Sequence, residues 1–127
     1  MSKNSQCHFC ELTEDRIIDQ TENCIVIHDL YPVTLMHTLI ITKRHVASYF
    51  DLNEQERDDV SHLIDKHKHL IEQEDGSVSG FNIGINCGET AGQTVMHCHI
   101  HLIPRRKGDM DEPRGGVRGV IPDKQSY

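Results

Sequence analysis

Tryptophan is absent from this 127-residue sequence, which contains only three tyrosines and three phenylalanines. So few aromatic side chains leave little material for a platform on which nucleic-acid bases could stack. Basic residues are also scarce, because 13 lysines and arginines stand against 20 aspartates and glutamates, for a net charge of −7. A general nucleic-acid binder needs a net basic surface, so we expect no nucleic-acid partner.

Long hydrophobic runs are absent as well. No apolar stretch approaches the roughly 18–20 residues that span a bilayer, and residues 1–16 contain no signal-peptide core. We therefore expect a cytoplasmic protein without a membrane partner. The five cysteines are an odd number, which favours thiols or metal ligands in a reducing compartment over disulfides.

The length favours a single domain over residues 1–127 with one core. β-Branched and alternating apolar residues predict five short strands, at 16–20, 24–28, 37–45, 81–88 and over the histidine-rich stretch that follows residue 96. From about residue 105 the chain is rich in glycine, proline and charge, which predicts an irregular tail. The lack of strand–helix–strand alternation indicates an α+β class with a five-stranded, largely antiparallel sheet.

One long helix is predicted over residues 53–74. Asn53 and Glu56 have the spacing of a capping box, and Gly76 marks the end. The residues expected on its apolar face recur at helical spacing: they are Val60, Leu63, Ile64, His67, Leu70 and Ile71. We interpret His67 as a core or interface histidine.

The most specific feature is the stretch His97-Cys98-His99-Ile100-His101-Leu102-Ile103. In an extended strand, residues two apart point to the same face, so His97, His99 and His101 would present three imidazoles to one side. Neighbouring rings would stand roughly 6.5 Å apart along the backbone and could converge on one group. One imidazole can attack an electrophile while the others orient it, donate to phosphate oxygens or hold a metal.

The flanking residues favour an anionic ligand over a bare metal. Glycines and side-chain donors precede the histidines, and cations follow them: the residues are Gly88, Gly92, Gln93, Thr94, Arg105, Arg106 and Lys107. Donors on one side and cations on the other suit a phosphate group.

The stretch resembles the signature of the histidine-triad (HIT) family of nucleotide hydrolases and transferases, in which histidines alternate with apolar residues. The resemblance extends from Cys7 to about Asp109, and the flanks AGQTV and IPRRKGD look most like the diadenosine-polyphosphate hydrolase branch. It implies cleavage at the α-phosphate of a nucleotide through a covalent nucleotidyl-histidine intermediate. It also implies a homodimer whose two sheets join, and an adenine nucleotide as substrate. Since attack at phosphorus needs charge stabilisation that imidazoles and amides can supply, no catalytic metal is required.

By this resemblance, His99 is the nucleophile, with His97 and His101 beside it and Thr94 bonded toward the leaving-group oxygen. The resemblance also implies four substrate-binding residues. Asp29 would bind the ribose hydroxyls and Asn86 the phosphate, His37 would face the site, and Gln93 would lie beside Thr94. Many relatives have Gly, Pro-Gly or Pro-Thr before the histidine that corresponds to His37, where this chain has Leu35-Met36.

Cys7 and Cys10 form a C-x-x-C pair whose two thiolates leave a tetrahedral zinc incomplete. Family members with this pair complete the site with two histidines, which the resemblance identifies as His45 and His97. A structural Cys₂His₂ zinc is therefore implied, and plain reduced thiols are the alternative.

Other functions remain open at this point. The same mechanism would serve a nucleoside phosphoramidate or an adenylyl-sulfate as substrate. The chain could instead be a non-catalytic nucleotide-binding or zinc-stabilised module. It could also be a metalloenzyme in which His97, His99 and His101 hold a catalytic ion.

Overall fold

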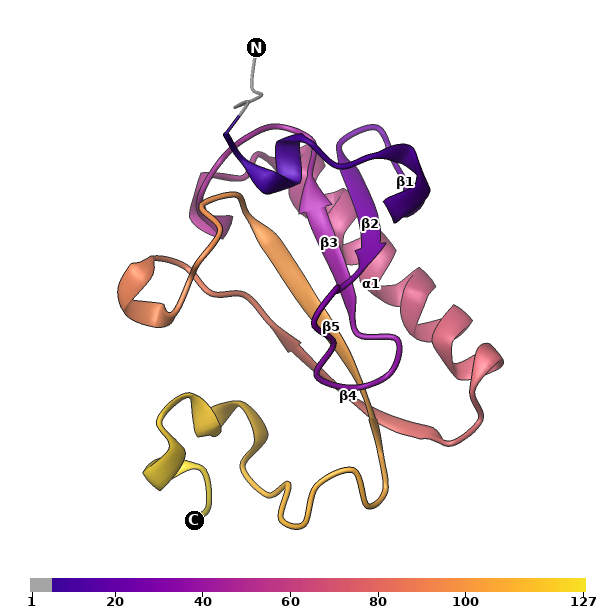
Figure 1. Ribbon diagram of the computed structural model, residues 1–127, viewed down its shortest axis with the longest axis vertical. Helices are drawn as coiled ribbons and strands as arrows, with labels where there is room; N and C mark the ends of the chain where they lie inside the picture. The colour runs from indigo at the N-terminus through magenta and orange to yellow at the C-terminus, as the bar shows by residue number, and fades with distance from the viewer. Residues whose placement is uncertain (1–5) are drawn as a thin grey trace.

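The strands pair into one antiparallel sheet that runs across the molecule in the order β1-β2-β3-β5-β4. A computed structural model describes residues 6–127. Its strands and helix are β1 (Ile17–Gln20), β2 (Cys24–His28), β3 (Thr38–Thr42), α1 (Glu54–Glu74), β4 (Val78–Gly84) and β5 (His99–Arg106) (Figure 1). The predicted α+β class with five antiparallel strands and one long helix is confirmed. No helix in this part of the chain is long and apolar enough to cross a bilayer.

Helix α1 begins as its sequence predicts. The Asn53 side chain accepts from the Glu56 backbone N–H, and the Glu56 carboxylate accepts from the Asn53 backbone N–H, which completes the capping box. The helix ends at Glu74, with Asp75 as its C-cap. The prediction that Leu70 belongs to the buried face is wrong, since Leu70 is 43% exposed. His67 is buried and bonds Asp19 at 2.9 Å, which confirms a core role.

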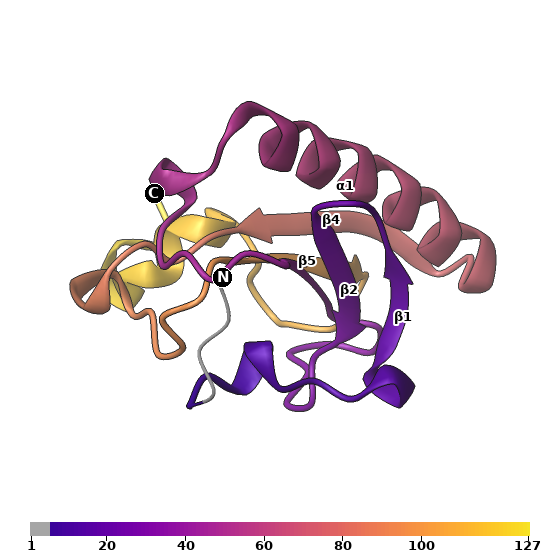
Figure 2. The same cartoon turned by 90° about the horizontal axis from the view of Figure 1, so that it is seen from above.

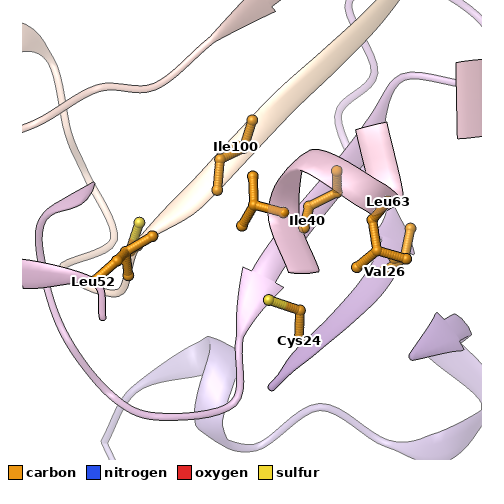
Figure 3. Packing of buried hydrophobic residues seen from close by; sticks show 8 residues of the cluster. Cys24, Val26, Ile40, Leu52, Leu63 and Ile100 are labelled. Atoms are coloured by element: carbon orange, nitrogen blue, oxygen red, sulfur yellow. The ribbon is translucent and has the colours of Figure 1, made fainter. Parts of the chain in front are cut away.

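The sheet is covered on both faces, which explains why β3 is buried at every position. Figure 2 shows α1 on one side of the sheet and the N-terminal segment on the other. The α1 face carries a cluster that includes Cys24, Val26, Ile40, Ile100 and Leu63 (Figure 3). The opposite face carries Ile25, Ile27, Leu39 and Ile41, against which Phe9 and Leu12 pack. Alternate residues of the same strands therefore build two separate cores.

Several predicted strand bounds are wrong. The third strand covers only 38–42 of the expected 37–45, and the fourth covers 78–84 instead of 81–88. The last strand begins at His99, so His97 lies before it, where the Cys98 N–H donates to Val46 O at 2.7 Å. Pairing with β5 sets these ends, since the β4 ladder stops where Gly84 meets His101.

The tail is irregular as predicted, but later than expected. Arg105 and Arg106 still belong to β5, and only the residues beyond them leave the sheet. Two short 3₁₀ segments follow, at Gly116–Val120 and Pro122–Lys124. The first of them lies against β4, so the tail returns to the sheet edge (Figure 1).

Candidate active site

The strand register places the predicted site residues in rows across the face opposite α1. Leu39 pairs with His101 in one direction and with Ile27 in the other, so these three side chains share a face. Ile41 pairs with His99 in the next row of the same face. A cavity of about 420 Å³ opens over these rows, with His99, His101, Leu39 and Ile27 on its wall.

His99 has a defined tautomer. Its Nδ1 lies 2.7 Å from the carbonyl oxygen of His97, an acceptor, so Nδ1 carries the proton and donates it there. Nε2 of a neutral His99 is then left with a free lone pair. The side chain lines the cavity and is only 9% exposed. Phe9 packs edge-on against it, with ring centroids 5.0 Å apart, so the imidazole is held from two sides.

His37 and His101 form a chain of hydrogen bonds with an equally defined direction. The Val33 N–H donates to His37 Nδ1 at 3.0 Å, so a neutral His37 carries its proton on Nε2. His37 Nε2 then donates to His101 Nδ1 at 2.9 Å, with Asp29 Oδ2 at 3.6 Å from the same nitrogen. His101 must therefore carry its own proton on Nε2. That N–H is the donor His101 has for a cavity ligand.

Burial keeps this pair neutral. Desolvation lowers the pKa of His37, and the nearby Asp29 carboxylate opposes that shift only in part. Desolvation, with the neighbouring His99 and His37, lowers the pKa of His101 to about 4. At neutral pH both rings are uncharged, so the chain of donors and acceptors is fixed.

Of the other predicted substrate-contacting residues, three line the cavity and one supports the loop beside it. Asp29, Asn86 and Thr94 line the cavity. Gln93 does not line it: its carboxamide accepts from the Gly88 N–H and donates to the carbonyl oxygens of Ala47 and Val95. These bonds give Gln93 a structural role in shaping the loop, and contact with a ligand stays a prediction.

Sequence reasoning missed most of the cavity wall, which combines apolar residues with His8 and Arg16. The missed wall residues are His8, Phe9, Arg16, Ile27, Leu30, Tyr31, Val33, Leu39 and Val95. Phe9 could have been predicted to lie near the site, because it stands between Cys7 and Cys10 in the sequence. Ile27 and Leu39 could not, because nothing in the sequence distinguishes them from ordinary core residues.

The backbone before His37 is strained. Met36 has φ = 69°, the left-handed region that favours glycine. This is the position at which the family resemblance notes a departure from Gly-containing loops. The strain is compatible with the placement of His37, which still reaches His101.

A second cluster lies beside the cavity. The ligand atoms of Cys7, Cys10, His45 and His97 all lie within 4.8 Å of one another. Cys7 Sγ is 3.4 Å from His97 Nδ1, Cys10 Sγ is 3.3 Å from His45 Nδ1, and the two Nδ1 atoms are 3.2 Å apart. A tetrahedral zinc with Zn–S about 2.3 Å and Zn–N about 2.05 Å would place such atoms about 3.4–3.6 Å apart. The residues therefore fit zinc in both type and spacing.

The tautomer of His97 leaves Nδ1 free to bind a metal. Its Nε2 lies 2.6 Å from the Thr42 carbonyl oxygen, so Nε2–H is the donor and Nδ1 keeps its lone pair. Burial lowers the pKa of His97, which favours the neutral form that a metal needs. Because Nδ1 points to the cysteines, His97 does not join His99 and His101 around a common ion. The arrangement therefore speaks against a metal site made of the three alternating histidines.

A family model described as the HIT domain matches residues 11–108. The chain belongs to the HIT family.

Three HIT relatives are informative. An asymmetrical bis(5′-nucleosyl)-tetraphosphatase from Schizosaccharomyces pombe is 42% identical over 84 residues, which cover 66% of this chain and 46% of that protein. The structure of Plasmodium falciparum diadenosine triphosphate hydrolase in complex with cyclomarin A superposes with a TM-score of 0.73 at 28% identity, over 80% of this chain and 68% of the other. A zinc-bound histidine triad family protein from Mycobacterium smegmatis has a TM-score of 0.73 and 33% identity, over 81% and 77% of the two chains. The HIT family thus includes hydrolases of dinucleoside polyphosphates.

Proposed function

We propose that this protein is a nucleotidyl hydrolase or transferase that cleaves dinucleoside polyphosphates at the α-phosphate. The observation that carries the proposal is the His99 tautomer: the ring donates through Nδ1 to the His97 carbonyl and keeps the Nε2 lone pair in the cavity. Two relatives are named as hydrolases of such substrates. The proposal does not specify the nucleobase of the substrate; adenine is a prediction from the family resemblance alone.

The proposed reaction has two steps. His99 Nε2 attacks the α-phosphorus, so an N–P bond forms and the bond from phosphorus to the bridging oxygen breaks. The leaving group keeps the electron pair on that oxygen. Water then attacks the same phosphorus and loses a proton to solvent as the N–P bond breaks, and a nucleoside monophosphate and neutral His99 are released. Transfer to another acceptor replaces water in the second step.

Charge on the phosphoryl oxygens must be stabilised in both steps. The His101 Nε2–H is a donor for these oxygens, and Asn86 adds an amide from the cavity wall. Thr94 would donate to the bridging oxygen as the leaving group departs. Asp29 would accept from the ribose hydroxyls. Since these groups provide the stabilisation, we expect no catalytic metal.

We propose that Cys7, Cys10, His45 and His97 hold a structural zinc ion. The spacing of their ligand atoms and the zinc-bound relative support this. When bound, the ion would tie the N-terminal segment to His97, the residue whose carbonyl oxygen accepts the hydrogen bond from His99 Nδ1–H. The ion itself takes part in no step of the reaction.

We also propose a homodimer with a continuous sheet. β4 is an edge strand, and Ile83 on it is 49% exposed, so a partner strand could extend the sheet there. Light scattering on the wild type would give the mass of two chains if this is right.

Two alternatives differ in chemistry and are tested together with the main proposal. A nucleoside phosphoramidate or an adenylyl-sulfate would use the same nucleophile with another leaving group. A binding module would use the cavity without turnover. The test is release of nucleoside monophosphate from a panel of these substrates, with quenching in alkaline detergent to detect phosphorus bound to protein, since the N–P bond of the intermediate is stable to base and labile in acid.

The expected result is turnover and a labelled His99 in the wild type, and neither in His99→Ala. His69→Ala is the matched control, since His69 is an exposed residue of α1. If the wild type binds nucleotide but releases no monophosphate from any substrate of the panel, the proposed enzyme is excluded in favour of a binding module.

A further inference from the structure

A second cavity, of about 240 Å³, lies on the same face of the sheet, toward β4. It shares Val33, His37, Asn86 and His101 with the larger cavity. Its other wall residues come from β4, from Ile103 of β5 and from the tail, whereas those of the larger cavity come from the N-terminal segment, from β2 and β3 with the loop between them, and from the loop that leads into His99. Because β5 lies between β3 and β4, the two cavities are on opposite sides of His101.

The strand register shows why there is space here. Gly84 pairs with His101 and Asn82 pairs with Ile103, so these four residues lie on the cavity face. Gly84 has no side chain to fill the space next to His101. A Cβ built at Gly84 would meet no atom within 4 Å, and the backbone there does not have a positive φ. The opening is therefore a consequence of one residue type at one register position.

The tail closes the far side of this cavity. Val117, in the 3₁₀ segment Gly116–Val120, is on its wall. The segment is close to β4, since a Cβ added at Gly116 would lie 3.2 Å from Asn82 Nδ2. Arg105 links Asn82 of β4 to the start of the tail, because it donates to Asn82 Oδ1 at 2.7 Å and pairs with Asp109 at 2.8 Å. The tail thus has a defined position beside the candidate active site.

The lining suits a heterocyclic base. Apolar surface from Val33, Ile103 and Val117 surrounds amide groups of Asn82 and Asn86, the combination of apolar wall and few polar groups that is typical of ligand sites. The volume is below the about 300 Å³ at which pockets for a whole drug-sized ligand begin. The cavity therefore fits part of a ligand whose remainder lies elsewhere, and the shared wall identifies the larger cavity as that place.

We propose that this second cavity binds the nucleoside of the leaving group. The inference rests on the proposed function. One nucleoside lies over Ile27 and Leu39, its phosphate reaches His99, and the polyphosphate chain passes His101 and Asn86 to bring the second nucleoside against Ile103 and Val117. The cavity then determines the preference for dinucleoside polyphosphates over substrates with a small leaving group.

Gly84→Leu tests the proposal, because it places a side chain in the cavity without backbone strain. Gly80→Leu is the matched control, on the same face of the same strand but outside the cavity, where the new Cβ lies 3.9 Å from Arg105 Cβ. The measurement is kcat/KM for a dinucleoside tetraphosphate and for a nucleoside 5′-phosphoramidate, whose leaving group carries no nucleoside. The ratio of the two values should fall about tenfold or more in Gly84→Leu and stay within about twofold of wild type in Gly80→Leu.

A second variant removes the apolar wall from another element. Val117→Asp should lower the same ratio, and circular dichroism should show that both Gly84→Leu and Val117→Asp remain folded. An unchanged ratio in two folded variants would overturn the second subsite while the wild type still releases nucleoside monophosphate. Absence of release from the wild type would instead overturn the proposed function. If light scattering showed that Gly84→Leu and Val117→Asp both dissociate a wild-type dimer, the cavity would belong to a second copy of the chain, and the subsite would again be wrong.

Discussion

At the scale of single residues, one backbone N–H determines the proton positions of two histidines. Val33 fixes the tautomer of His37, and His37 fixes that of His101. His37 is therefore a positioning residue, because it acts on a ligand only through the His101 Nε2–H.

Replacing His37 therefore has a spectroscopic consequence. In His37→Leu nothing donates to His101 Nδ1, so nitrogen NMR shifts should change from one tautomer to a mixture of two. kcat should fall about tenfold, which is less than the about 10²-fold loss for removing a direct donor to the reacting group. His37→Gln keeps an N–H donor, so it should restore much of the single tautomer of His101 and much of kcat. A single unchanged tautomer in His37→Leu would contradict this account.

The same burial makes stability depend on pH. The pKa of His101 is about 4 in the folded chain, against about 6.5 unfolded. Between these values the unfolded chain binds more protons, so the contribution to stability is present above pH 6.5 and is lost as the pH falls toward 4. His37 and His97 act in the same direction.

Urea unfolding at pH 7 and pH 5 tests this dependence. The free energy of unfolding should decrease from pH 7 to pH 5, and His101→Asn should reduce that decrease by about 1 kcal/mol after allowance for solvent screening. The exposed His69 provides the comparison, because His69→Asn should leave the difference as it is in wild type. An equal difference in wild type and His101→Asn would show that His101 is not held neutral.

At the scale of elements, Glu56 joins the start of α1 to the loop after β3. Glu56 is 2% exposed, and its carboxylate accepts from the Asn53 N–H and pairs with Arg44 through both oxygens. Arg44 precedes His45, so the cap and the metal cluster share a loop. The Arg44 side chain lowers the pKa of Glu56, which is therefore charged at neutral pH.

Removing the cap should cost stability without changing the chemistry. Asn53→Ala should lower the free energy of unfolding by about 1 kcal/mol, with kcat unchanged for any substrate that the wild type turns over. Chemical denaturation and initial rates measure the two effects. Glu54→Ala, at an exposed position next to the cap, should change neither by a comparable amount.

The elements were largely predictable, because periodicity and caps are local. Residues 53–74 carry both a capping box and a 3.6-residue pattern, and the helix formed there. The strand ends were not, since the partner strand sets them: β4 extends back to Val78 to pair with Arg106. Likewise the family motif pointed to His99 and His101, but the wall residues Ile27 and Leu39 are identified only by the register that aligns them with His101.

At the scale of the whole molecule, the N-terminal segment and the last strand depend on each other. Phe9 packs on the sheet, and Cys7 and Cys10 meet His97, ninety and eighty-seven residues further on. A zinc ion there would close a loop that contains almost the entire sheet. Binding of that ion would be coupled to folding, since the unfolded chain has no preformed site.

Removal of the metal should accordingly act through the fold. The protein should contain one zinc per chain by elemental analysis, and a chelator should lower the melting temperature by about 10 °C, for a loss of about 3 kcal/mol. Activity should decline only over the time of metal loss and unfolding, because the His97 carbonyl, and not the metal, holds the His99 ring in its tautomer.

Cys10→Ser should lower both zinc content and melting temperature, whereas Cys87→Ser, outside the cluster, should leave the zinc content at one per chain. Immediate loss of activity on chelation, before any change in circular dichroism, would instead assign the metal to the reaction itself and remove the basis for a purely structural site.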